Sequence, residues 1–395
     1  MSCSSSDEPP PAAPPDPYAA CAAVVAPSAD DQTAVQTALI NAEPGSLLCM
    51  KAGTYSFVGE LSLSSDGVTL RGDGAGKTIL DFSGQTTGAN GIVITGDGVT
   101  IEALDVLNTP GDGVRANDVN DITFRDMVVG WDAAASLDNG AYGLYPVGST
   151  GVRIERCKVY GARDAGIYVG QSTKILITDS EAYGNVAGIE IENSTDAEVT
   201  KCSAHDNTAG ILVFNLPGLP VQDGKRAKIH DNRVENNNLD NFAAEGTVVA
   251  DVPPGTGMMV LASDSNEFHD NTITGNKSVG IVITSYLEDL FGDYDDVNFD
   301  PYPQGNFIHD NEFSGNGGEP ATLIDAVIPV DPVPDIIWDG CLDPGLPASP
   351  ELTNCLSGLG TATYINFDFC TMPPAPSQDI TEVTCEYDSL PAQNP

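Results

Sequence analysis

Long apolar runs and basic residues are both scarce in this chain of 395 residues. No apolar run reaches 18 residues, so the sequence predicts no membrane-spanning helix. Lys and Arg together number 16, against 57 Asp and Glu, and the formal net charge is −41. Repulsion between like charges argues against nucleic acid and anionic membrane surfaces as partners, and it favours a saline or cation-rich exterior where ions screen the acidic surface.

A short pattern recurs at a fixed spacing. It reads GIYVGQS at 166–172, GIEIENS at 188–194 and GILVFN at 210–215, so its glycines lie 22 residues apart. The same opening recurs at Gly91, Gly113, Gly143, Gly257 and Gly280. A fixed period of this length is typical of a solenoid, in which each coil of three short strands contacts only its neighbours. We therefore expect a stack of coils over residues 61–316.

The two ends of the chain differ from the coils. Residues 18–60 contain DDQTAVQTALINAEPGS, which predicts an amphipathic helix with Asp30 or Asp31 as its N-cap and a Pro-Gly stop. We interpret them as an N-terminal cap. Residues 317–395 lose the period and become Pro-rich, and we expect a C-terminal segment stapled by disulfides.

Cysteine positions predict disulfides near both ends and thiols in the middle. Cys21 and Cys49 bracket the predicted helix. The last 55 residues hold four more cysteines, whose pairing the sequence leaves open: Cys341, Cys355, Cys370 and Cys385. Cys157 and Cys202 fall at one position two coils apart, a separation of about 9.6 Å that is too long for a bridge, so we expect buried thiols. Disulfides at both ends indicate an exported protein.

Histidine and asparagine recur in one phrase. His-Asp-Asn occurs at 205–207, 230–232, 269–271 and 309–311. We interpret the histidines as one repeated coil position and the asparagines as turn ladders whose side chains bond the backbone of adjacent coils. A metal-binding row of histidines is the alternative.

Two sets of phrases carry a family resemblance. The run AGTYSF…LSL…GVTLRGDGAGKTIL resembles the entry into the right-handed parallel β-helix of the pectin-lyase-like superfamily. The phrases GLYPVGS, GARDAGIYVGQS, NVAGIEIENS, NTAGILVFNLPGLPV and PPGTGMMVLA resemble a bacterial family of exported parallel β-helix repeat proteins, often lipoproteins, without a settled activity. The resemblance implies an all-β, right-handed parallel β-helix. The wider superfamily is rich in polysaccharide lyases, hydrolases and C5-epimerases, although the DPHD-type epimerase signature is absent from this chain and Gly148 stands where the family pattern favours Gln.

The start of the chain, MSCSSSDEPPPAAPPDP, resembles that of a mature bacterial lipoprotein with an initiator Met in place of the removed signal. The resemblance implies lipidation of Cys3, with residues 1–17 as a stiff, disordered tether. We therefore predict a monomer in the cell envelope, in the periplasm or at the outer surface, which is secreted or meets the membrane only through this lipid.

Alternation along the Gly-opened strand predicts two columns of outward side chains. One column holds Arg115, Tyr145, Tyr168, Glu190 and Leu212, and the other holds Asn117, Val147, Gly170, Glu192 and Phe214. Glu190 and Glu192 should lie about 6.6 Å apart, which suits the acid and base of an inverting hydrolase or a cation site.

These groups predict a groove for an acidic polysaccharide. We expect Glu190, Glu192, Arg163, Asp164 and Tyr168 to act in catalysis, as acids, bases or neutralising groups of a lyase or hydrolase. In a lyase, Arg163, Lys158 or Tyr168 would take the proton. We expect Arg115 to bind uronate carboxylates and Tyr145 and Phe214 to lie against sugar rings. The alternative is a chance pattern of surface residues.

Calcium is the predicted cofactor, from the acidic insertion at 286–305. Its candidate ligands are Asp293, Asp295 and Asp296, although their spacing does not fit the EF-hand template and a solvated acidic loop is an equal alternative.

A non-catalytic envelope protein is the second function that the sequence leaves open. The coils would form a rigid rod, and the loops at 215–227 and 239–256 would dock a protein partner. Apolar residues expected to be exposed on one side favour it, namely Leu212, Phe214, Leu216, Pro217, Leu219 and Pro220. An open trough over the columns would favour sugar, and a covered strip would favour the structural role.

Overall fold

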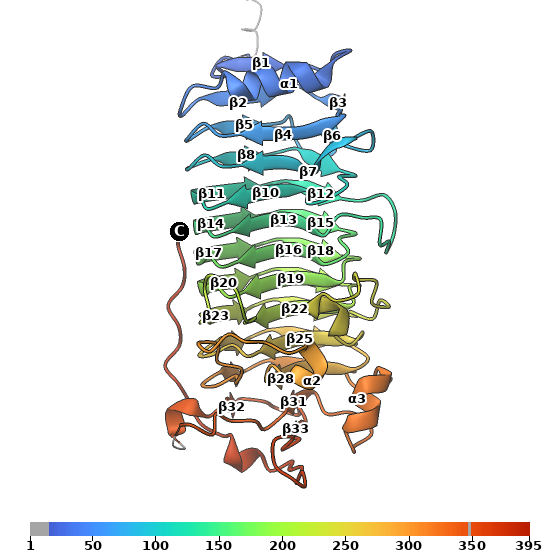
Figure 1. Cartoon of the computed structure of the whole chain (residues 1–395), viewed down its shortest axis with the longest axis vertical. Coiled ribbons are helices and arrows are strands. Elements are labelled where there is room, and N and C mark those ends of the chain that lie inside the picture. Colours follow the sequence, from blue (N-terminus) through green and yellow to red (C-terminus); the bar gives the residue numbers. More distant parts are fainter. Residues whose placement is uncertain (1–15, 347–348) are drawn as a thin grey trace, which may run out of the picture.

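Coils of the chain contribute strands to three parallel β-sheets that run the length of the molecule (Figure 1). The computed structural model describes residues 16–346 and 349–395. Neighbouring coils pair in parallel, with Ile167 opposite Ile189 and Ile189 opposite Ile211. The chain is therefore a parallel β-helix, and the predicted fold class is confirmed.

Each sheet takes one strand from successive coils, so neighbouring strands in a sheet follow one another in chain order. The 12-stranded sheet contains β1 (Ala23–Val25), β2 (Leu47–Met50), β5 (Thr69–Arg71), β8 (Thr100–Glu102), β11 (Asn120–Arg125), β14 (Thr150–Glu155), β17 (Thr173–Thr178), β20 (Thr195–Thr200), β23 (Lys225–His230), β26 (Glu267–His269), β29 (Phe307–His309) and β32 (Cys355–Ser357). The 11-stranded sheet contains β4 (Gly59–Leu63), β7 (Thr87–Ile94), β10 (Val114–Asn117), β13 (Tyr142–Val147), β16 (Ala165–Gly170), β19 (Ala187–Glu192), β22 (Ala209–Phe214), β25 (Thr256–Leu261), β28 (Val279–Thr284), β31 (Ile336–Trp338) and β33 (Tyr364–Asn366). The 10-stranded sheet contains β3 (Gly53–Ser56), β6 (Thr78–Asp81), β9 (Asp105–Leu107), β12 (Val128–Gly130), β15 (Lys158–Tyr160), β18 (Glu181–Tyr183), β21 (Ser203–His205), β24 (Arg233–Glu235), β27 (Thr272–Thr274) and β30 (Glu312–Ser314).

Ladders of aliphatic side chains fill the interior. Ile167, Ile189 and Ile211 are all 0% exposed and stack in successive coils. Burying each such side chain contributes about 1.5–3 kcal/mol. Cys157 and Cys202 are buried free thiols of the same core, as predicted.

Asparagine ladders hold the turns between coils. Oδ1 of Asn207 accepts the backbone N–H and the side-chain amide of Asn185, each at 3.0 Å. Its Nδ2 donates to the carbonyl of Ala182 at 3.0 Å and to Oδ1 of Asn237 at 2.9 Å. The ladder continues to Asn316. Buried amides thus find their partners in adjacent coils, and the predicted turn ladders are confirmed.

The four histidines occupy two coil positions, and the prediction of a single position is wrong. His230, His269 and His309 stack on the 12-stranded sheet, with ring centroids 4.8 and 5.0 Å apart. His205 lies on the 10-stranded sheet and stacks on Tyr183 at 5.5 Å. The Asp of each phrase has a φ between 50° and 54°, so the phrase encodes a left-handed turn, and more than one corner of the coil needs such a turn.

The helix α1 (Asp31–Ile40) covers the N-terminal end of the coils (Figure 1). Asp30 is its N-cap, and the Asp30 side chain accepts the N–H of Thr33 at 3.1 Å. Val35 and Leu39 are each 1% exposed because they pack against the core. In the part of the chain that the structure describes, no helix is long and apolar enough to cross a membrane.

Three disulfides occur among residues 16–346 and 349–395, and they give the pairing that the sequence leaves open: Cys21–Cys49, Cys341–Cys370 and Cys355–Cys385. Disulfides persist in oxidising compartments, which suggests an extracellular or envelope location. The two C-terminal bridges staple the segment that carries β32, β33 and the short helices η2 (Pro350–Leu352) and η3 (Ile380–Glu382).

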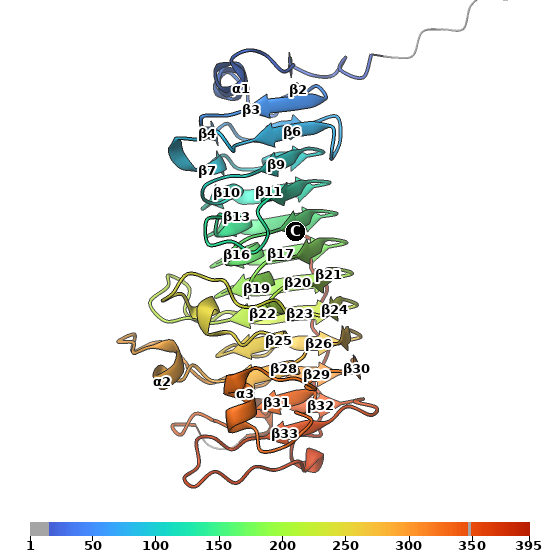
Figure 2. The same cartoon turned by 90° about the vertical axis from the view of Figure 1, so that its right-hand side faces the viewer.

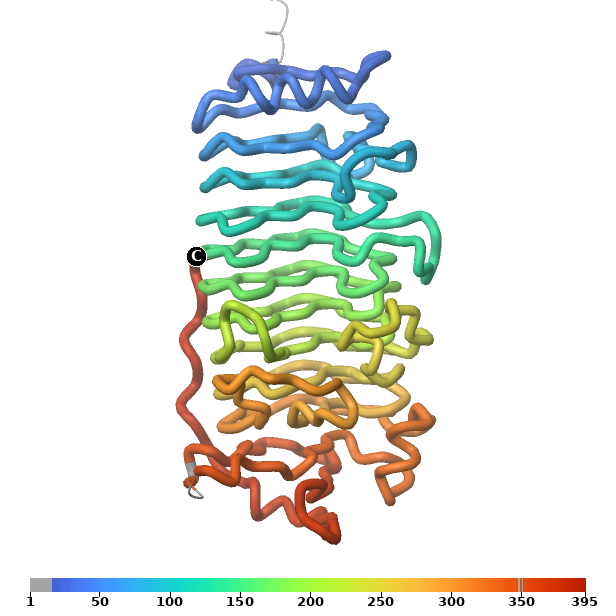
Figure 3. Tube along the Cα trace, in the orientation of Figure 1, coloured from blue at the N-terminus to red at the C-terminus, as the bar shows by residue number. Residues whose placement is uncertain are grey.

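The last residues form an extended tail that runs back along the 12-stranded sheet to the level of β14 (Figures 1 and 3). The N–H of Leu390 donates to Oε2 of Glu267 at 2.7 Å. The N–H of Gln393 donates to Oε2 of Glu198 at 2.5 Å. Glu267 and Glu198 are only 2% and 6% exposed, so the tail is tied to the sheet through buried carboxylates.

Insertions gather on the outer face of the 11-stranded sheet (Figure 2). They carry η1 (Val248–Asp251), α2 (Glu288–Phe291) and α3 (Thr322–Val327). Their apolar side chains pack on outward side chains of the sheet and form a second core, which we name the outer apolar cluster. Its members include Leu212, Phe214, Met259, Phe291 and Ile324.

Candidate functional site

Both predicted outward columns are present on the 11-stranded sheet as the alternation requires, and the second runs from Asn117 through Gly170 and Glu192 to Phe214. Arg115 pairs with Tyr145, and Tyr168 pairs with Glu190. The next coil places Leu212 beside Glu190. The structure therefore brings cationic, aromatic and acidic side chains together in four consecutive coils.

Three tyrosine rings meet at this point. The rings of Tyr142 and Tyr145 stack with centroids 4.5 Å apart, and Tyr168 lies 4.7 and 4.9 Å from them. The guanidinium carbon of Arg115 lies 4.8 Å from the Tyr145 ring centroid, within cation–π range. Sequence reasoning missed Tyr142. In the next coil the same position is occupied by Ala165. A tyrosine at a position where the repeat otherwise has alanine was the signal that could have revealed Tyr142.

Glu192 lies at the base of the tyrosine rings. The Tyr168 hydroxyl donates to Oε1 of Glu192 at 2.5 Å, and Nε2 of Gln171 donates to the same oxygen at 3.0 Å. Gly170 makes the first contact possible, because a Cβ atom there would lie 2.2 Å from the Tyr168 hydroxyl. A glycine in the second column therefore lets Tyr168 reach the carboxylate of the next coil.

Three buried carboxyl groups form the centre of the site. Asp164, Glu190 and Glu192 are 9%, 3% and 8% exposed. Burial, together with the charge of Glu192, raises the pKa of Asp164 to about 7. Burial and the charges of Glu192 and Asp164 hold the pKa of Glu190 well above its usual range, and burial raises the pKa of Glu192. Because the three buried carboxyl groups repel one another when charged, they cannot all ionise together. The set of three therefore retains protons near neutral pH. We name Tyr142, Tyr145, Tyr168, Asp164, Glu190 and Glu192 the tyrosine–carboxylate cluster.

Two arginines flank the cluster. Nε of Arg163 is buried, and no atom of the described residues accepts a hydrogen bond from it. Its charge lowers the pKa of both Asp164 and Asp112, although burial raises the pKa of Asp112 to about 6 overall. Nη1 of Arg115 lies 3.5 Å from Oδ2 of Asp112. Sequence reasoning missed Asp112, which precedes a Gly-opened strand much as Asp164 does.

The strip is closed over most of its length, and it is not the open trough that would favour sugar. Tyr168 is 4% exposed and Phe214 is 1% exposed. Phe214, predicted to contact substrate, packs in the outer apolar cluster because the insertions fold back over it. The accessible part is the rim, where Arg115, Tyr145 and Arg163 are partly exposed.

The apolar residues that the sequence assigned to an exposed face are largely covered by the chain itself. Leu212 is 0% exposed, and Leu216 packs against the outer apolar cluster. The prediction of an exposed apolar side is therefore wrong at Leu212 and Phe214, because their covering segments lie far along the chain.

Lys158 is separated from the cluster. Its Nζ lies 2.7 Å from Oε2 of Glu181, on the 10-stranded sheet, so it does not reach the carboxylates of the other face. Cys3, the predicted lipid site, lies outside the described residues.

The calcium ligands predicted in the 286–305 insertion do not form a cage. Oδ2 of Asp296 accepts from the N–H of Gly218 at 3.0 Å and from Nε2 of Gln222 at 2.8 Å, so this carboxylate holds the 215–224 loop. Asp293 and Asp295 are exposed. Among the described residues, no group of three or more His, Cys, Asp or Glu side chains is placed to hold a metal ion.

Comparison with known proteins supports the fold. A family model described as right handed beta helix region matches residues 90–217 and 137–290, which together span just over half of the chain. No curated protein matches the chain in sequence.

Solved structures share the same architecture. The A-module of mannuronan C-5 epimerase AlgE4 from Azotobacter vinelandii is similar with a TM-score of 0.53 and 19% identity, over 84% of this chain and 92% of that one. The AlgE6 A-module from the same organism has a TM-score of 0.53 and 16% identity, over 84% and 91%. ORF18 of Geobacillus virus E2 has a TM-score of 0.54 and 14% identity, over 73% of this chain and 55% of that one. At these identities the likeness shows the fold.

Proposed function

The chain belongs to the family of right-handed β-helix proteins, and from this premise we propose that it binds an acidic polysaccharide and processes it at the tyrosine–carboxylate cluster. One observation carries the proposal. Arginines that can bind carboxylates and rings that can hold sugars lie directly beside three buried acids that retain protons.

The rim recognises the polymer in this proposal. Arg115 and Arg163 bind uronate carboxylates, because a guanidinium matches a carboxylate with two parallel hydrogen bonds. Nε of Arg163 is buried and has no hydrogen-bond partner among the described residues, so it can donate to the polymer once the rim opens, without breaking an existing bond. Tyr142 and Tyr145 present ring faces to the sugar.

The buried acids perform the proton transfers. Glu190 keeps a proton at neutral pH and serves as the general acid toward a glycosidic oxygen. Glu192 receives hydrogen bonds from Tyr168 and Gln171, so it carries negative charge more readily and serves as the base. Tyr168 itself stays protonated, because burial and the charges of Glu192 and Glu190 hold its pKa well above the usual range. With Glu190 as the acid and Glu192 as the base, the site supports either hydrolysis or β-elimination.

Access to the acids requires the rim to open. Glu190 is 3% exposed beside rings that are only partly exposed, so a sugar reaches it when Tyr142 and Tyr145 rotate outward. Such ring motion exchanges one stacked contact, worth about 0.5–1.5 kcal/mol, for a contact with the sugar. The cluster is therefore closed when empty and opens on binding.

The comparisons support a carbohydrate as the class of ligand. Two of the similar structures are mannuronan C-5 epimerases, and mannuronan is a polyuronate. Lipidation of Cys3 remains a proposal. Calcium binding by Asp293, Asp295 and Asp296 would require the 286–305 insertion to change its conformation, because their carboxylates do not converge in this one.

The test is a screen of the purified chain against alginate, pectate, polygalacturonate and glycosaminoglycans, with and without Ca²⁺. Absorbance near 235 nm reports elimination, and new reducing ends without it report hydrolysis. Glu190→Gln should abolish turnover while the melting temperature holds, and Glu181→Gln, on the other face, should leave turnover intact. Absence of both turnover and binding for every glycan would sink the proposal.

A non-catalytic envelope protein is the second candidate, and one observation favours it. The insertions cover the outer face from β19 to β31 and leave a rod without a continuous open groove there. In that case the glycan screen stays negative, and Glu190→Gln changes stability alone.

A further inference from the structure

A cavity lies on the same outer face, and its floor begins at β25, two coils beyond the Glu190 strand β19. Its volume is about 600 Å³, within the range of small-molecule sites. The floor is the outer face of β25, β28 and β31, at Met259, Val282 and Ile337. The 286–302 loop with α2, the helix α3 and the segment around Phe367 form its walls.

Aromatic rings make up much of the wall. They are Tyr286, Phe291, Tyr294, Tyr302, Phe367 and Phe369. Tyr286 contacts Tyr294 edge-on at 5.5 Å, and its hydroxyl donates to the carbonyl of Phe291 at 2.8 Å. Because these rings are packed on one another, the cavity keeps its shape without a ligand. Ring faces attract cations.

The charged groups of the cavity have one sign. Asp251, Glu288 and Asp289 are at the rim, and Asp339 is at the floor. Among the residues that the structure describes, no Lys, Arg or His lines the cavity. An anionic ligand would therefore meet four carboxylates without a counter-charge, and a cationic ligand would meet its complement.

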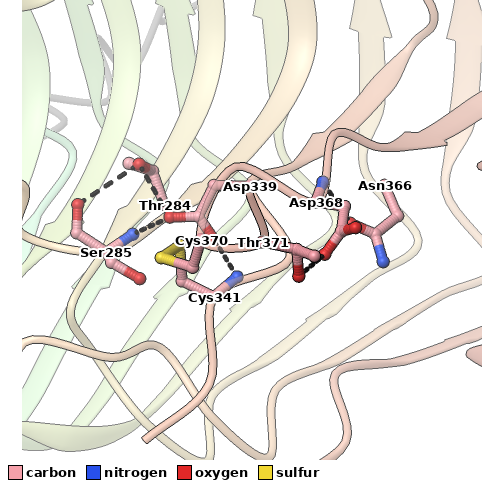
Figure 4. Close-up of a disulfide and its surroundings, with 8 residues drawn as sticks. All are labelled: Thr284, Ser285, Asp339, Cys341, Asn366, Asp368, Cys370 and Thr371. Atoms are coloured by element: carbon pink, nitrogen blue, oxygen red, sulfur yellow. Dashed lines mark hydrogen bonds between the residues drawn. A yellow bond between two sulfur atoms is a disulfide. The ribbon is translucent and has the colours of Figure 1, made fainter. Parts of the chain in front are cut away.

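Asp339 is held rigidly in the floor. It is 7% exposed, and it accepts the N–H of Ser285 at 2.7 Å and the N–H of Cys341 at 2.9 Å. Figure 4 shows these contacts beside the Cys341–Cys370 disulfide, which joins the segment that follows β31 to the wall of the cavity at Cys370. No basic side chain lies among the described lining residues. Burial raises the pKa of Asp339, while the N–H groups of Ser285 and Cys341 lower it, so a cation bound beside it would favour its ionised form.

We propose that this cavity binds an organic cation with an apolar body, an amine or quaternary ammonium whose charge faces Asp339 and the acidic rim while its body packs on the aromatic wall. The site is independent of the polysaccharide site, because it shares none of its residues with the tyrosine–carboxylate cluster. The chain's net charge of −41 further concentrates cations near its surface.

Three fluorescent probes with one body and different charges test the proposal on the whole chain. They are trimethylammonium-diphenylhexatriene, neutral diphenylhexatriene and its anionic propionate, whose emission rises in apolar surroundings. The cation should saturate at one per chain, the neutral probe should bind at least tenfold more weakly, and the anion should not bind in the same range. Equal affinity for cation and neutral probe, or no saturable binding of any probe, overturns the proposal.

Variants separate the cavity from general attraction to an acidic surface. Val327→Trp fills the mouth at a position that is 37% exposed, and it should abolish cation binding without changing the net charge. Asp339→Asn should weaken the cation at least fivefold and leave the neutral probe unchanged. Asp295→Asn, on the same loop but outside the cavity, is the matched control and should change neither. Binding that survives Val327→Trp contradicts the proposal.

If Asp339→Asn does not fold, a double substitution tests whether the negative charge of the cavity contributes to cation binding. Asp251→Asn combined with Asp289→Asn removes two rim carboxylates at exposed positions. Cation affinity should fall at least fivefold, and unchanged affinity in this folded variant overturns the role of the acidic rim.

Discussion

The hydroxyl of Tyr168 lies 2.5 Å from Oε1 of Glu192, a hydrogen bond between two consecutive coils. Gln171 donates to the same oxygen at 3.0 Å. Oε2 of Glu190 is buried and has no hydrogen-bond partner anywhere in residues 16–346 or 349–395. Two glutamates of one strand therefore differ in environment. Burial raises the pKa of both carboxyl groups, but donors from Tyr168 and Gln171 lower it again at Glu192 alone, so Glu190 is the more readily protonated of the two.

Tyr168→Phe should change the pKa of Glu192 without removing any hydrogen bond of Glu190. Loss of the hydroxyl removes a donor that lowers the pKa of Glu192, so that pKa should rise further. The free energy of unfolding should fall by about 1–3 kcal/mol, because a buried oxygen loses a partner. Urea denaturation measures the stability, and the acid limb of the pH profile of binding or turnover should move to higher pH. Tyr183→Phe is the control, since that ring lies on the 10-stranded sheet and stacks on Tyr160, away from the cluster. An equal shift of the profile in both variants would contradict the assignment.

Stability should decline as pH rises from about 4 to about 7. Asp164 has a folded pKa of about 7, well above its ordinary value, so the folded state binds more protons than the unfolded state in this window. The contribution of Asp164 to the free energy of unfolding is therefore present at low pH and is lost as the pH rises through the pKa that Asp164 has in the folded state. Thermal melts across this window measure the decline, and Asp164→Asn should flatten it. Asp264→Asn removes another buried acid with a pKa of about 7 outside the cluster, so it should also flatten the curve but leave glycan binding intact. A wild-type melting temperature that is constant across the window would refute the shared-proton description.

Asn207→Ala should weaken the stack at its centre. The substitution removes the acceptor of both amide groups of Asn185 and the donor to Asn237. Because these groups are buried, the free energy of unfolding should fall by about 2–4 kcal/mol. Chemical denaturation measures the loss. Asn298→Ala, at an exposed loop position, should change stability by less than about 0.5 kcal/mol. Similar losses at the two positions would show that the ladder contributes little.

Glu267→Gln should loosen the C-terminal tail. Glu267 accepts the N–H of Leu390 at 2.7 Å and lies 3.2 Å from Nε2 of His309. An ionised acceptor forms a hydrogen bond roughly twice as strong as a neutral one. The substitution should therefore weaken the bond from the Leu390 N–H by about 1 kcal/mol, which corresponds to roughly fivefold faster amide exchange at Leu390. Hydrogen exchange resolved to the tail peptide measures it. Glu235→Gln, which removes an exposed pair with Arg233, is the control. Unchanged exchange would mean that the tail is held by its other contacts.

Much of the site could be read in advance from the coil period. Once the glycines set the register, alternation places Arg115, Tyr145, Tyr168 and Glu190 in one outward column, as the structure shows. The raised pKa values could not be read in this way, because they depend on what covers each carboxyl group. Asp112 was missed because it lies outside the strands, where alternation does not apply, and Tyr142 because it is the first residue of β13, before the Gly-opened phrase that set the register.

The sequence by itself determined the features that depend on neighbouring coils. A period of 22 residues, inward aliphatics and paired Asn turns specify a parallel stack, because each coil meets the next through the same few positions. Only the tertiary structure decided which face is covered and which histidines share a column. The insertions that bury Phe214 begin up to about a hundred residues away from it, and such contacts leave no periodic signal in the chain. The closed cluster, the acidic cavity and the docked tail all arise from these non-periodic segments.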